Sequence, residues 1–461
     1  MSRTRKVLKL TIFLSGLGIL LISIVVPPIF GLDILAQKTI GIFFLTISLW
    51  ITGYLPPAIT GLLVLGLVPL LQIIPPSETF SLFGNRAVFF ILGVFIISAS
   101  FMKTGLAKRL TLFFFILFKG SPFRIIIGVY FIAFFFSLLM PEHAVAALLF
   151  PILLKMDHLL QIKNKKFEAL LFLSMAWGCV SGGIGTPLGG ARAPLAIGLL
   201  QENFGVEIEF LRWTQMAIPL AVLLFIFSIV YIYLLTRNLP AHIKEKINSI
   251  KLEESPAEIS QDEKKVIFIY GIALFGWIFL NRVVDMAVVA ILSSILLFIF
   301  KVITWKDVES YVNWGIILMY GGAIVLGKTM VESGAASWFA LNILFPLAHS
   351  PWSTFWLFVI TTIAFTEMMS NVATCAFILP IAYGFVSILN IDPFFVTLMV
   401  AIPSGLAFLL PIGTPANAIA FSSGKYSISR GVILGISYIP FSLLSLYLVA
   451  KFVWSFMGLK L

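Results

Sequence analysis

Three adjacent residues interrupt an apolar stretch and carry chemistry that is costly in hydrocarbon. Residues 136–152 have the sequence FSLLMPEHAVAALLFPI, in which Pro141, Glu142 and His143 stand among apolar and small residues. Proline ends a helix because it has no backbone N–H to donate. A carboxylate and an imidazole are costly inside a membrane unless they are paired, hydrogen-bonded or in contact with water. The stretch therefore predicts a break at membrane depth with polar groups at its tip.

The composition of the whole chain indicates a protein that lies in a membrane. Of 461 residues, 60% are hydrophobic and 11% are charged, and the mean hydropathy is +1.08. Soluble domains do not reach these values. Apolar stretches of about 20 residues, the length that a membrane-spanning helix needs, recur along the chain. We expect an all-α polytopic membrane protein with about 11 transmembrane helices in the lipid bilayer.

The net charge of +11 comes from short basic clusters between the apolar stretches. These clusters lack the interleaved aromatic residues of a nucleic-acid surface, so we expect no nucleic-acid partner. About three quarters of the Lys and Arg residues fall in segments that the positive-inside rule assigns to the cytoplasm. This places the N-terminus in the cytoplasm of a cell-membrane protein. The assigned segments are 3–9, 103–124 (a basic amphipathic stretch), 155–166, 237–265, 301–306 and 425–430.

The second half of the chain repeats the first. A shift of 229 positions lays FTEMMSNVATCAFILPI (365–381) on residues 136–152, with identity at six of 17 positions, and a shift of 228 lays GTP at 413–415 on GTP at 185–187. Five spans separate equivalent points, so the copies face opposite sides of the membrane. Inverted repeats with paired broken helices are typical of secondary transporters with a site at the bilayer midplane.

Each repeat contributes a hairpin tip and an interrupted helix. The first has the tip at 141–143 and the interruption SGGIGTPLGG at 181–190; the second has Ser370 and Asn371 with PIGTPAN at 411–417. Half-helix N-termini can bind an anion, and unwound carbonyls can coordinate sodium. Simple capping and kinks at small residues are the alternative. Matching interruptions in both halves favour transport.

The predicted organisation has four parts. We expect an N-terminal transmembrane helix (1–35), a first repeat (36–236) with hairpin 123–154 and broken helix 168–200, a cytoplasmic linker (237–265), and a second repeat (266–461) with hairpin 353–388 and broken helix 394–422. The arms of the first hairpin, Phe123 to Met140 and Ala144 to Leu154, look too short to span the bilayer.

The second-half motifs FTEMMSNVATCAFILPI and AFLLPIGTPANAIAFSSG resemble those of the divalent anion to sodium symporter family, which transports dicarboxylates, citrate and sulfate. The resemblance implies a homodimer, a scaffold, and an elevator-type transport subdomain with sodium at both hairpin tips and the dianion between them. It implies no organic cofactor. Substrate contacts would come from Ser370, Asn371, Thr414 and Pro415, and second-half sodium ligands from Thr366, the Met369 carbonyl, Asn371 and the Gly413 carbonyl.

The first half departs from this family pattern. Pro141, Glu142 and His143 replace the usual Ser-Asn-Thr, and only Ser137 survives of the side chains expected around the first sodium, as a vestigial site. Two registers are open for the broken helix. Family spacing selects GGARA at 189–193, and repeat spacing selects GTP at 185–187. The candidate first-half substrate contacts are therefore Pro141, Glu142, His143, Thr186, Gly190 and Arg192.

Charge suggests a hypothesis for this departure. A fixed cation, His143 or Arg192, can replace a sodium ion beside a dianion. Glu142 would then pair with Arg192 or carry a proton. The alternative is that the tip reaches cytoplasmic water and that Glu142 and His143 are solvated. Away from the tips, we expect Glu367 to support the second hairpin by buried hydrogen bonds and Asp285 to pair with Arg282.

Other functional classes fit the sequence less well. No GxSxG or HExxH motif and no pair of inward acids suggests an enzyme. A channel is a more distant alternative, because channels usually build selectivity from several subunits around one axis. We expect a secondary transporter that moves a small dianion, a dicarboxylate or sulfate, by alternating access coupled to sodium through the second-half site. Anion exchange and proton coupling are the alternatives.

Overall fold

The computed structural model describes residues 3–29, 31–109, 118, 120–160, 162, 164–239 and 258–459, and every regular element within these ranges is a helix. Residues 110–117 and 119 of the basic stretch predicted at 103–124, and most of the linker predicted at 237–265, lie outside the described residues.

Eight helices among the described residues are long and apolar enough to cross a membrane. Four shorter apolar helices of 10–17 residues accompany them. The polytopic all-α fold expected from composition is therefore confirmed. The eight are Val7–Val25, Ile34–Thr52, Pro76–Thr104, Pro122–Leu139, Phe210–Thr236, Trp314–Glu332, Asn371–Leu389 and Ile428–Trp454; the shorter ones are Pro57–Leu70, Met286–Ile299, Ala335–Leu344 and Pro393–Gly405.

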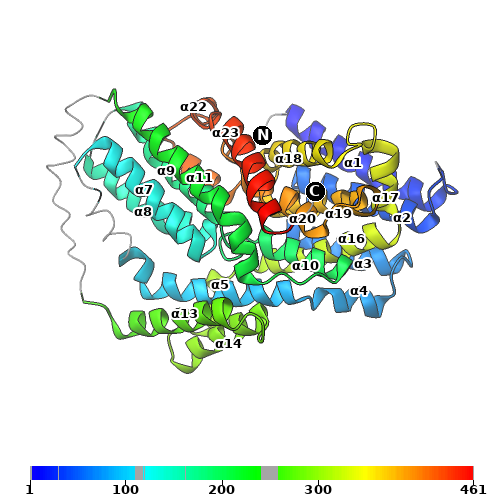
Figure 1. Cartoon of the computed structure of the whole chain (residues 1–461), viewed down its shortest axis with the longest axis horizontal. Helices are drawn as coiled ribbons and strands as arrows, with labels where there is room; N and C mark the ends of the chain where they lie inside the picture. The colour runs from blue at the N-terminus through cyan, green and yellow to red at the C-terminus, as the bar shows by residue number, and fades with distance from the viewer. Residues whose placement is uncertain are drawn as a thin grey trace.

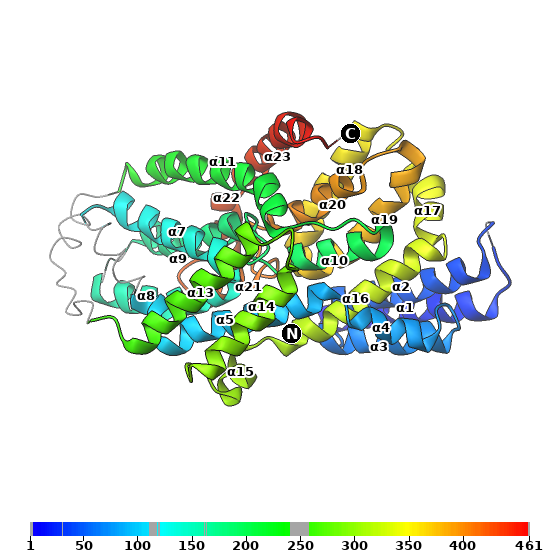
Figure 2. The same cartoon turned by 60° about the horizontal axis from the view of Figure 1, so that its bottom comes forward.

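The helices gather toward two ends of an elongated molecule (Figure 1). At one end lie α7 (Pro122–Leu139), α8 (Glu142–Leu160), α9 (Lys165–Gly183) and α11 (Phe210–Thr236). At the other end lie α1 (Arg3–Val25), α2 (Ile34–Thr52), α3 (Pro57–Leu70), α4 (Pro76–Phe83), α16 (Trp314–Glu332) and α17 (Ala335–Phe339). The turned view shows α10 (Arg192–Phe204), α19 (Asn371–Leu389) and α20 (Pro393–Ala401) between the two groups (Figure 2).

The remaining helices complete the chain. Helix α5 (Arg86–Thr104) packs against α13 (Gln261–Phe279) and α14 (Met286–Ile299), and also against α10 and α16. The others are α15 (Trp305–Tyr311), η1 (Ala340–Leu344), α18 (Pro351–Met368), η2 (Pro403–Gly405), α21 (Pro415–Ser422), α22 (Ile428–Gly435), α23 (Tyr438–Leu448) and η3 (Val449–Trp454).

Two hairpins repeat the same local chemistry 229 positions apart. Helix α7 begins after the N-cap Ser121 and α18 after the N-cap Ser350, and each cap is followed by a proline, which fits the first helical turn because no N–H is needed there. Both helices end at an extended methionine, Met140 in one and Met369 in the other, whose N–H bonds the carbonyl four residues earlier at 2.9 Å. The tips are therefore built by equivalent caps.

The second arm of the first hairpin is longer than the sequence suggested. Helix α8 continues through Pro151 and Lys155 to Leu160 and has 19 residues, whereas α7 has 18, the length expected for the first arm. The last turns of α8 carry Asp157, whose carboxylate pairs with Lys425 at 2.6 Å. The helix therefore extends into a polar segment beyond the point where the apolar pattern stops.

Close packing of α7 on α9 places the first broken helix beside the first tip. A Cβ on Gly178 would lie 2.4 Å from the Tyr130 carbonyl oxygen, and one on Gly182 would lie 2.1 Å from that of Phe134. Small residues four apart let two membrane helices approach at backbone distance. Helix α9 then ends at Gly183, and residues 184–191 lead without regular structure into α10.

Candidate functional site

The two hairpin tips meet at equivalent residues. Glu142 is the first residue of α8, and Asn371, 229 positions later, is the first residue of α19. Asn371 Nδ2 donates a hydrogen bond of 3.1 Å to Glu142 Oε1, and both side chains are buried. The repeat detected in the sequence therefore brings its two copies into contact at one point, inside the protein.

A buried cation joins this contact. Arg192 begins α10 and is 2% exposed, and its Nη1 lies 3.6 Å from Glu142 Oε2. The guanidinium fills a space left by glycines: a Cβ on Gly190 would lie 2.2 Å from Nη1, and one on Gly405 would lie 2.3 Å from Cζ. Since Gly405 belongs to η2, the guanidinium lies between the broken helices of the two repeats.

The charged groups at the first tip retain unused hydrogen-bonding capacity. Among the described residues, Glu142 Oε2, Arg192 Nη2 and Ser137 Oγ are buried without a hydrogen-bond partner. Glu142 is only 5% exposed, so the interpretation of this carboxylate as solvated is wrong. Buried polar atoms are normally satisfied, and a cluster of unsatisfied ones is typical of a site that receives a ligand.

The geometry decides between the two registers of the first broken helix. A Cβ on Gly189 would lie 2.2 Å from the carbonyl oxygen of Ser137, and one on Gly413 would lie 2.7 Å from that of Thr366. Ser137 and Thr366 are themselves 229 positions apart. The glycine of each broken helix therefore packs on the equivalent carbonyl of its own repeat. Residues 189–193 correspond to residues 413–417.

Thr186, the candidate from the other register, has a different role. Its hydroxyl donates to the Leu138 carbonyl at 2.6 Å and accepts from the Leu188 N–H at 3.3 Å. These bonds attach the irregular segment 184–191 to the last turn of α7. Thr186 therefore holds the arm of the hairpin in place.

His143 lies on another side of the tip. Its ring packs edge to face on Phe95 of α5, with centroids 5.6 Å apart and an interplanar angle of 84°. Pro141, also at the tip, is buried, and its carbonyl accepts the first N–H bonds of α8. Of the two cations proposed from the sequence, His143 and Arg192, it is therefore Arg192 that contacts Glu142.

In the second half, oxygen ligands of the kind that sodium prefers come together. Thr366 Oγ1 lies 2.9 Å from Asn371 Oδ1 and 2.5 Å from the Ser404 carbonyl oxygen, and its one hydrogen can be donated to either acceptor. Gly413 packs directly on the Thr366 backbone. Met369 lies at the tip with an extended backbone. Hydroxyl, amide and carbonyl oxygens suit a hard cation, so the residues present fit a sodium ion.

The second tip also offers donors to an anion. The Ser370 hydroxyl accepts the Ala373 N–H at 3.3 Å and caps α19, and the Thr414 hydroxyl accepts the Asn417 N–H at 3.0 Å and caps α21. A hydroxyl that accepts one bond still has its own hydrogen to donate. Pro415 follows Thr414 as the first residue of α21 and is exposed.

Glu367 supports the second broken helix. Its Oε1 accepts the N–H groups of Phe408 and Leu409 at 2.7 and 3.0 Å, and its Oε2 accepts that of Leu410 at 2.8 Å. The hydrogen bonds expected for this residue are present, but they hold the segment after η2 against the end of α18. Three otherwise unpaired N–H groups are thereby satisfied.

We expect Glu367→Gln to lower the free energy of unfolding by about 1–3 kcal/mol, because an amide nitrogen would face one of these three N–H groups and leave it without an acceptor. Thermal unfolding of the purified protein, followed by tryptophan fluorescence, measures the change. The control is Glu332→Gln, which changes a 44% exposed carboxylate that pairs with Lys328 at 3.0 Å on the same helix and should change stability by less than about 0.5 kcal/mol. Equal stability of the two variants would contradict the assigned role.

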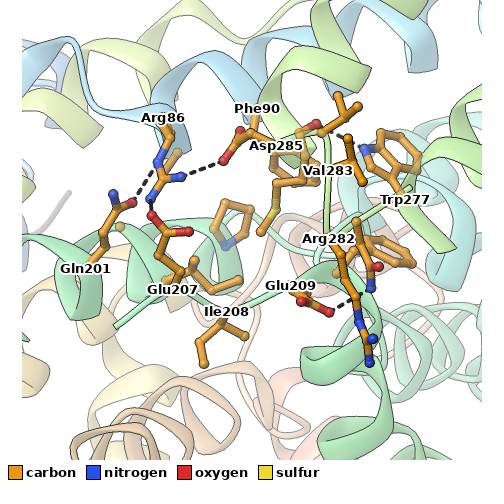
Figure 3. A pocket seen from close by; sticks show the side chains of 18 residues that line it. Arg86, Phe90, Gln201, Glu207, Ile208, Glu209, Trp277, Arg282, Val283 and Asp285 are labelled. Carbon is orange, nitrogen blue, oxygen red and sulfur yellow. Dashed lines mark hydrogen bonds and ion pairs between the residues drawn. The ribbon is translucent and has the colours of Figure 1, made fainter. Parts of the chain in front are cut away.

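A cavity of about 200 Å³ lies apart from the tips, between the start of α5, the end of α10 and the loop that joins α13 to α14 (Figure 3). Arg86 donates to Gln201 at 3.0 Å, Glu207 at 2.8 Å and Asp285 at 2.7 Å. The predicted pairing of Asp285 with Arg282 is therefore wrong. Asp285 caps α14 and faces Arg86, whereas Arg282 points away from it.

Together, the membrane-spanning helical fold and the repeated hairpins meeting beside interrupted helices define a membrane transporter. The family described as "Sodium:sulfate symporter transmembrane region" matches residues 6–459, and the chain belongs to this family. The family resemblance inferred from the second-half motifs is confirmed.

Curated relatives agree with this assignment. The chain is similar to the sodium-dependent dicarboxylate transporter SdcS of Staphylococcus saprophyticus, with 29% identity over 92% of this chain and 88% of the relative. The Staphylococcus aureus protein of the same name is 30% identical over 86% of this chain and 82% of its own length. These relatives are transporters, and so the chain is not assigned to an enzyme class.

One solved structure shares the fold. The Alcanivorax borkumensis YdaH transporter aligns with a TM-score of 0.52 over 81% of this chain and 85% of its own, at 16% identity. At this identity the likeness concerns the fold alone.

Proposed function

We propose that the protein is a secondary active transporter that moves a small divalent anion, a dicarboxylate or sulfate, across the cell membrane with sodium as the coupling ion. The observation that carries the proposal is the contact between the two tips, where Asn371, Glu142 and Arg192 converge from both repeats. Family membership and the sodium-dependent dicarboxylate relatives support the substrate class and the ion.

The chain's own groups have distinct roles in this proposal. Arg192 and the amide of Asn371 would bind substrate oxygens where the two tips meet, and the hydroxyls of Ser370 and Thr414 would bind them from the second tip. Sodium held by Thr366, Met369, Asn371 and Gly413 would supply positive charge beside the dianion. Charge-assisted bonds to carboxylate or sulfate are stronger than neutral ones, which favours a dianion over a neutral solute.

Larger-scale properties belong to the same proposal. We propose a cytoplasmic N-terminus, a homodimer, and alternating access by an elevator-type movement. The four-part organisation expected from the sequence, with a cytoplasmic linker at 237–265, is retained within it. The basic clusters between the spans support the orientation.

Anion exchange is the second candidate, and one observation favours it. Arg192 places a permanent positive charge at the first tip, at the position where relatives of the symporter type are expected to use sodium. Where an anion displaces Glu142 from Arg192, this fixed charge would take the place of one coupling ion, so the protein would couple to fewer sodium ions or exchange one anion for another.

Proteoliposomes separate these possibilities. Uptake of labelled succinate and of sulfate is measured with a sodium gradient, with a proton gradient, and with internal unlabelled substrate alone. Stimulation by the sodium gradient supports symport. Uptake that depends only on internal substrate identifies an exchanger, and uptake of neither anion under any condition contradicts the proposed function.

We expect Thr366→Val to remove most of the stabilisation that sodium gives the purified protein, because the change deletes a hydroxyl oxygen from the candidate ligand set and preserves volume. The thermal unfolding temperature is compared in sodium chloride and in choline chloride, and the sodium concentration for half of the shift should rise about tenfold.

Thr362 provides a matched control one turn earlier on α18. Its hydroxyl is buried and has no hydrogen-bond partner among the described residues. Thr362→Val should leave the sodium response unchanged. An undiminished response in Thr366→Val would exclude Thr366 as a ligand.

A further inference from the structure

On the basis of the transport function proposed above, we propose that the Glu142 carboxylate is a built-in competitor of the substrate: it occupies the amide of Asn371 and the guanidinium of Arg192, the donors that a substrate carboxylate or sulfate would use. Asn371 donates to one of its oxygens at 3.1 Å, and Arg192 lies 3.6 Å from the other. A carboxylate of the protein thus sits where a carboxylate of the substrate would bind.

The contact with Arg192 is loose compared with other ion pairs of the protein. Arg86 meets Glu207 at 2.8 Å and Lys425 meets Asp157 at 2.6 Å, both at more exposed positions. Charge-assisted bonds normally lie near 2.7–2.9 Å. At 3.6 Å the buried pair gains attraction without a good hydrogen bond, and both Glu142 Oε2 and Arg192 Nη2 remain without a hydrogen-bond partner. An incoming anion can therefore offer Arg192 a better partner.

The tip does not depend on the Glu142 side chain for its backbone structure. The Glu142 N–H donates to the Gly189 carbonyl at 2.9 Å, which ties the start of α8 to the first broken helix. The Pro141 carbonyl accepts the N–H groups of Ala144 and Val145. Because the main chain is held by these bonds, the carboxylate can change partners while the tip stays folded.

Displacement of Glu142 from Arg192 by a substrate anion changes the balance of charge at the tips. With Glu142 and Arg192 paired, these two residues together carry no net charge. A dianion that takes Arg192 must displace a carboxylate of like charge, so its binding free energy is reduced by the interaction that it replaces. Glu142 would then set the affinity of the site for an anion.

Glu142→Gln tests this inference. Gln keeps the volume and an oxygen for the Asn371 amide, but it no longer holds Arg192 by charge. Binding of labelled succinate and of sulfate to the purified full-length protein should tighten about tenfold. Both anions should also raise the unfolding temperature of the variant more than that of the wild type, because they neutralise the released guanidinium. Unchanged or weaker binding in a folded variant would overturn the inference.

Two further variants secure the interpretation. Glu142→Asp keeps the charge on a shorter side chain, so binding should tighten about threefold even if the Gln variant fails to fold, and a loss of affinity would count against competition. Glu367→Gln changes another buried carboxylate, outside this contact, and should not tighten binding. If the wild type binds and transports neither anion, the transport function itself is wrong; if it does and Glu142→Gln shows no gain, only the competition is wrong.

Discussion

Arg192→Gln is expected to abolish succinate and sulfate uptake and to lower the free energy of unfolding by about 3–5 kcal/mol. The guanidinium is 2% exposed and is the cation that contacts the buried Glu142 carboxylate. Removing one partner of a buried pair leaves the other charge without compensation, which costs more than the pair itself contributes. The same change deletes the donor that we assign to the substrate. Stability and uptake should therefore fall together.

A double variant separates these two effects. Glu142→Gln/Arg192→Gln removes both charges, so stability should recover by about 1–3 kcal/mol relative to Arg192→Gln while uptake stays absent. Arg86→Gln is the control for loss of an arginine. Its side chain is 37% exposed, so the stability loss should be near 1 kcal/mol. Substantial uptake by Arg192→Gln would exclude the guanidinium from the site.

The hairpins were predictable because local chemistry fixes them. A Ser-Pro pair opens each hairpin helix, a methionine closes it, and a shift of 229 positions relates the two copies. These features depend on caps and proline, whose effects act within a few residues. The same shift pointed to Glu142 and Asn371 as equivalent residues, although only the structure shows that they bond to each other.

Other parts of the site depend on contacts that no local pattern encodes. Arg86 meets Asp285 across 199 positions, and the nearby Arg282 was the more obvious partner by sequence. The register of the first broken helix depended on which glycine touches which carbonyl, because two glycine-containing segments fitted equally well. Glu367 bonds backbone groups more than 40 positions away. In each case the partner is selected by packing in three dimensions.

The close contact of Gly189 with the Ser137 carbonyl, which decided the register of the first broken helix, leads to the second prediction. Gly189→Ala should prevent accumulation of folded protein, with a destabilisation of at least about 3 kcal/mol. The added Cβ would lie 2.2 Å from the Ser137 carbonyl oxygen and 2.7 Å from Gly183 Cα. Both neighbours are backbone atoms, so no side chain can rotate away. The irregular segment would have to move and would lose the bond from the Glu142 N–H to the Gly189 carbonyl.

Two other glycine substitutions serve as comparisons for Gly189→Ala. Gly66→Ala, in α3, has no atom within 4 Å of the added Cβ and should be neutral or stabilising by up to about 1 kcal/mol, because alanine favours a helix. Gly413→Ala makes the equivalent clash with Thr366 in the second repeat and should be as harmful as Gly189→Ala. Yield of monodisperse protein and uptake per molecule measure both effects. Normal folding of Gly189→Ala together with loss of Gly413→Ala would mean that the first broken helix follows the other register, with Thr186 at the site.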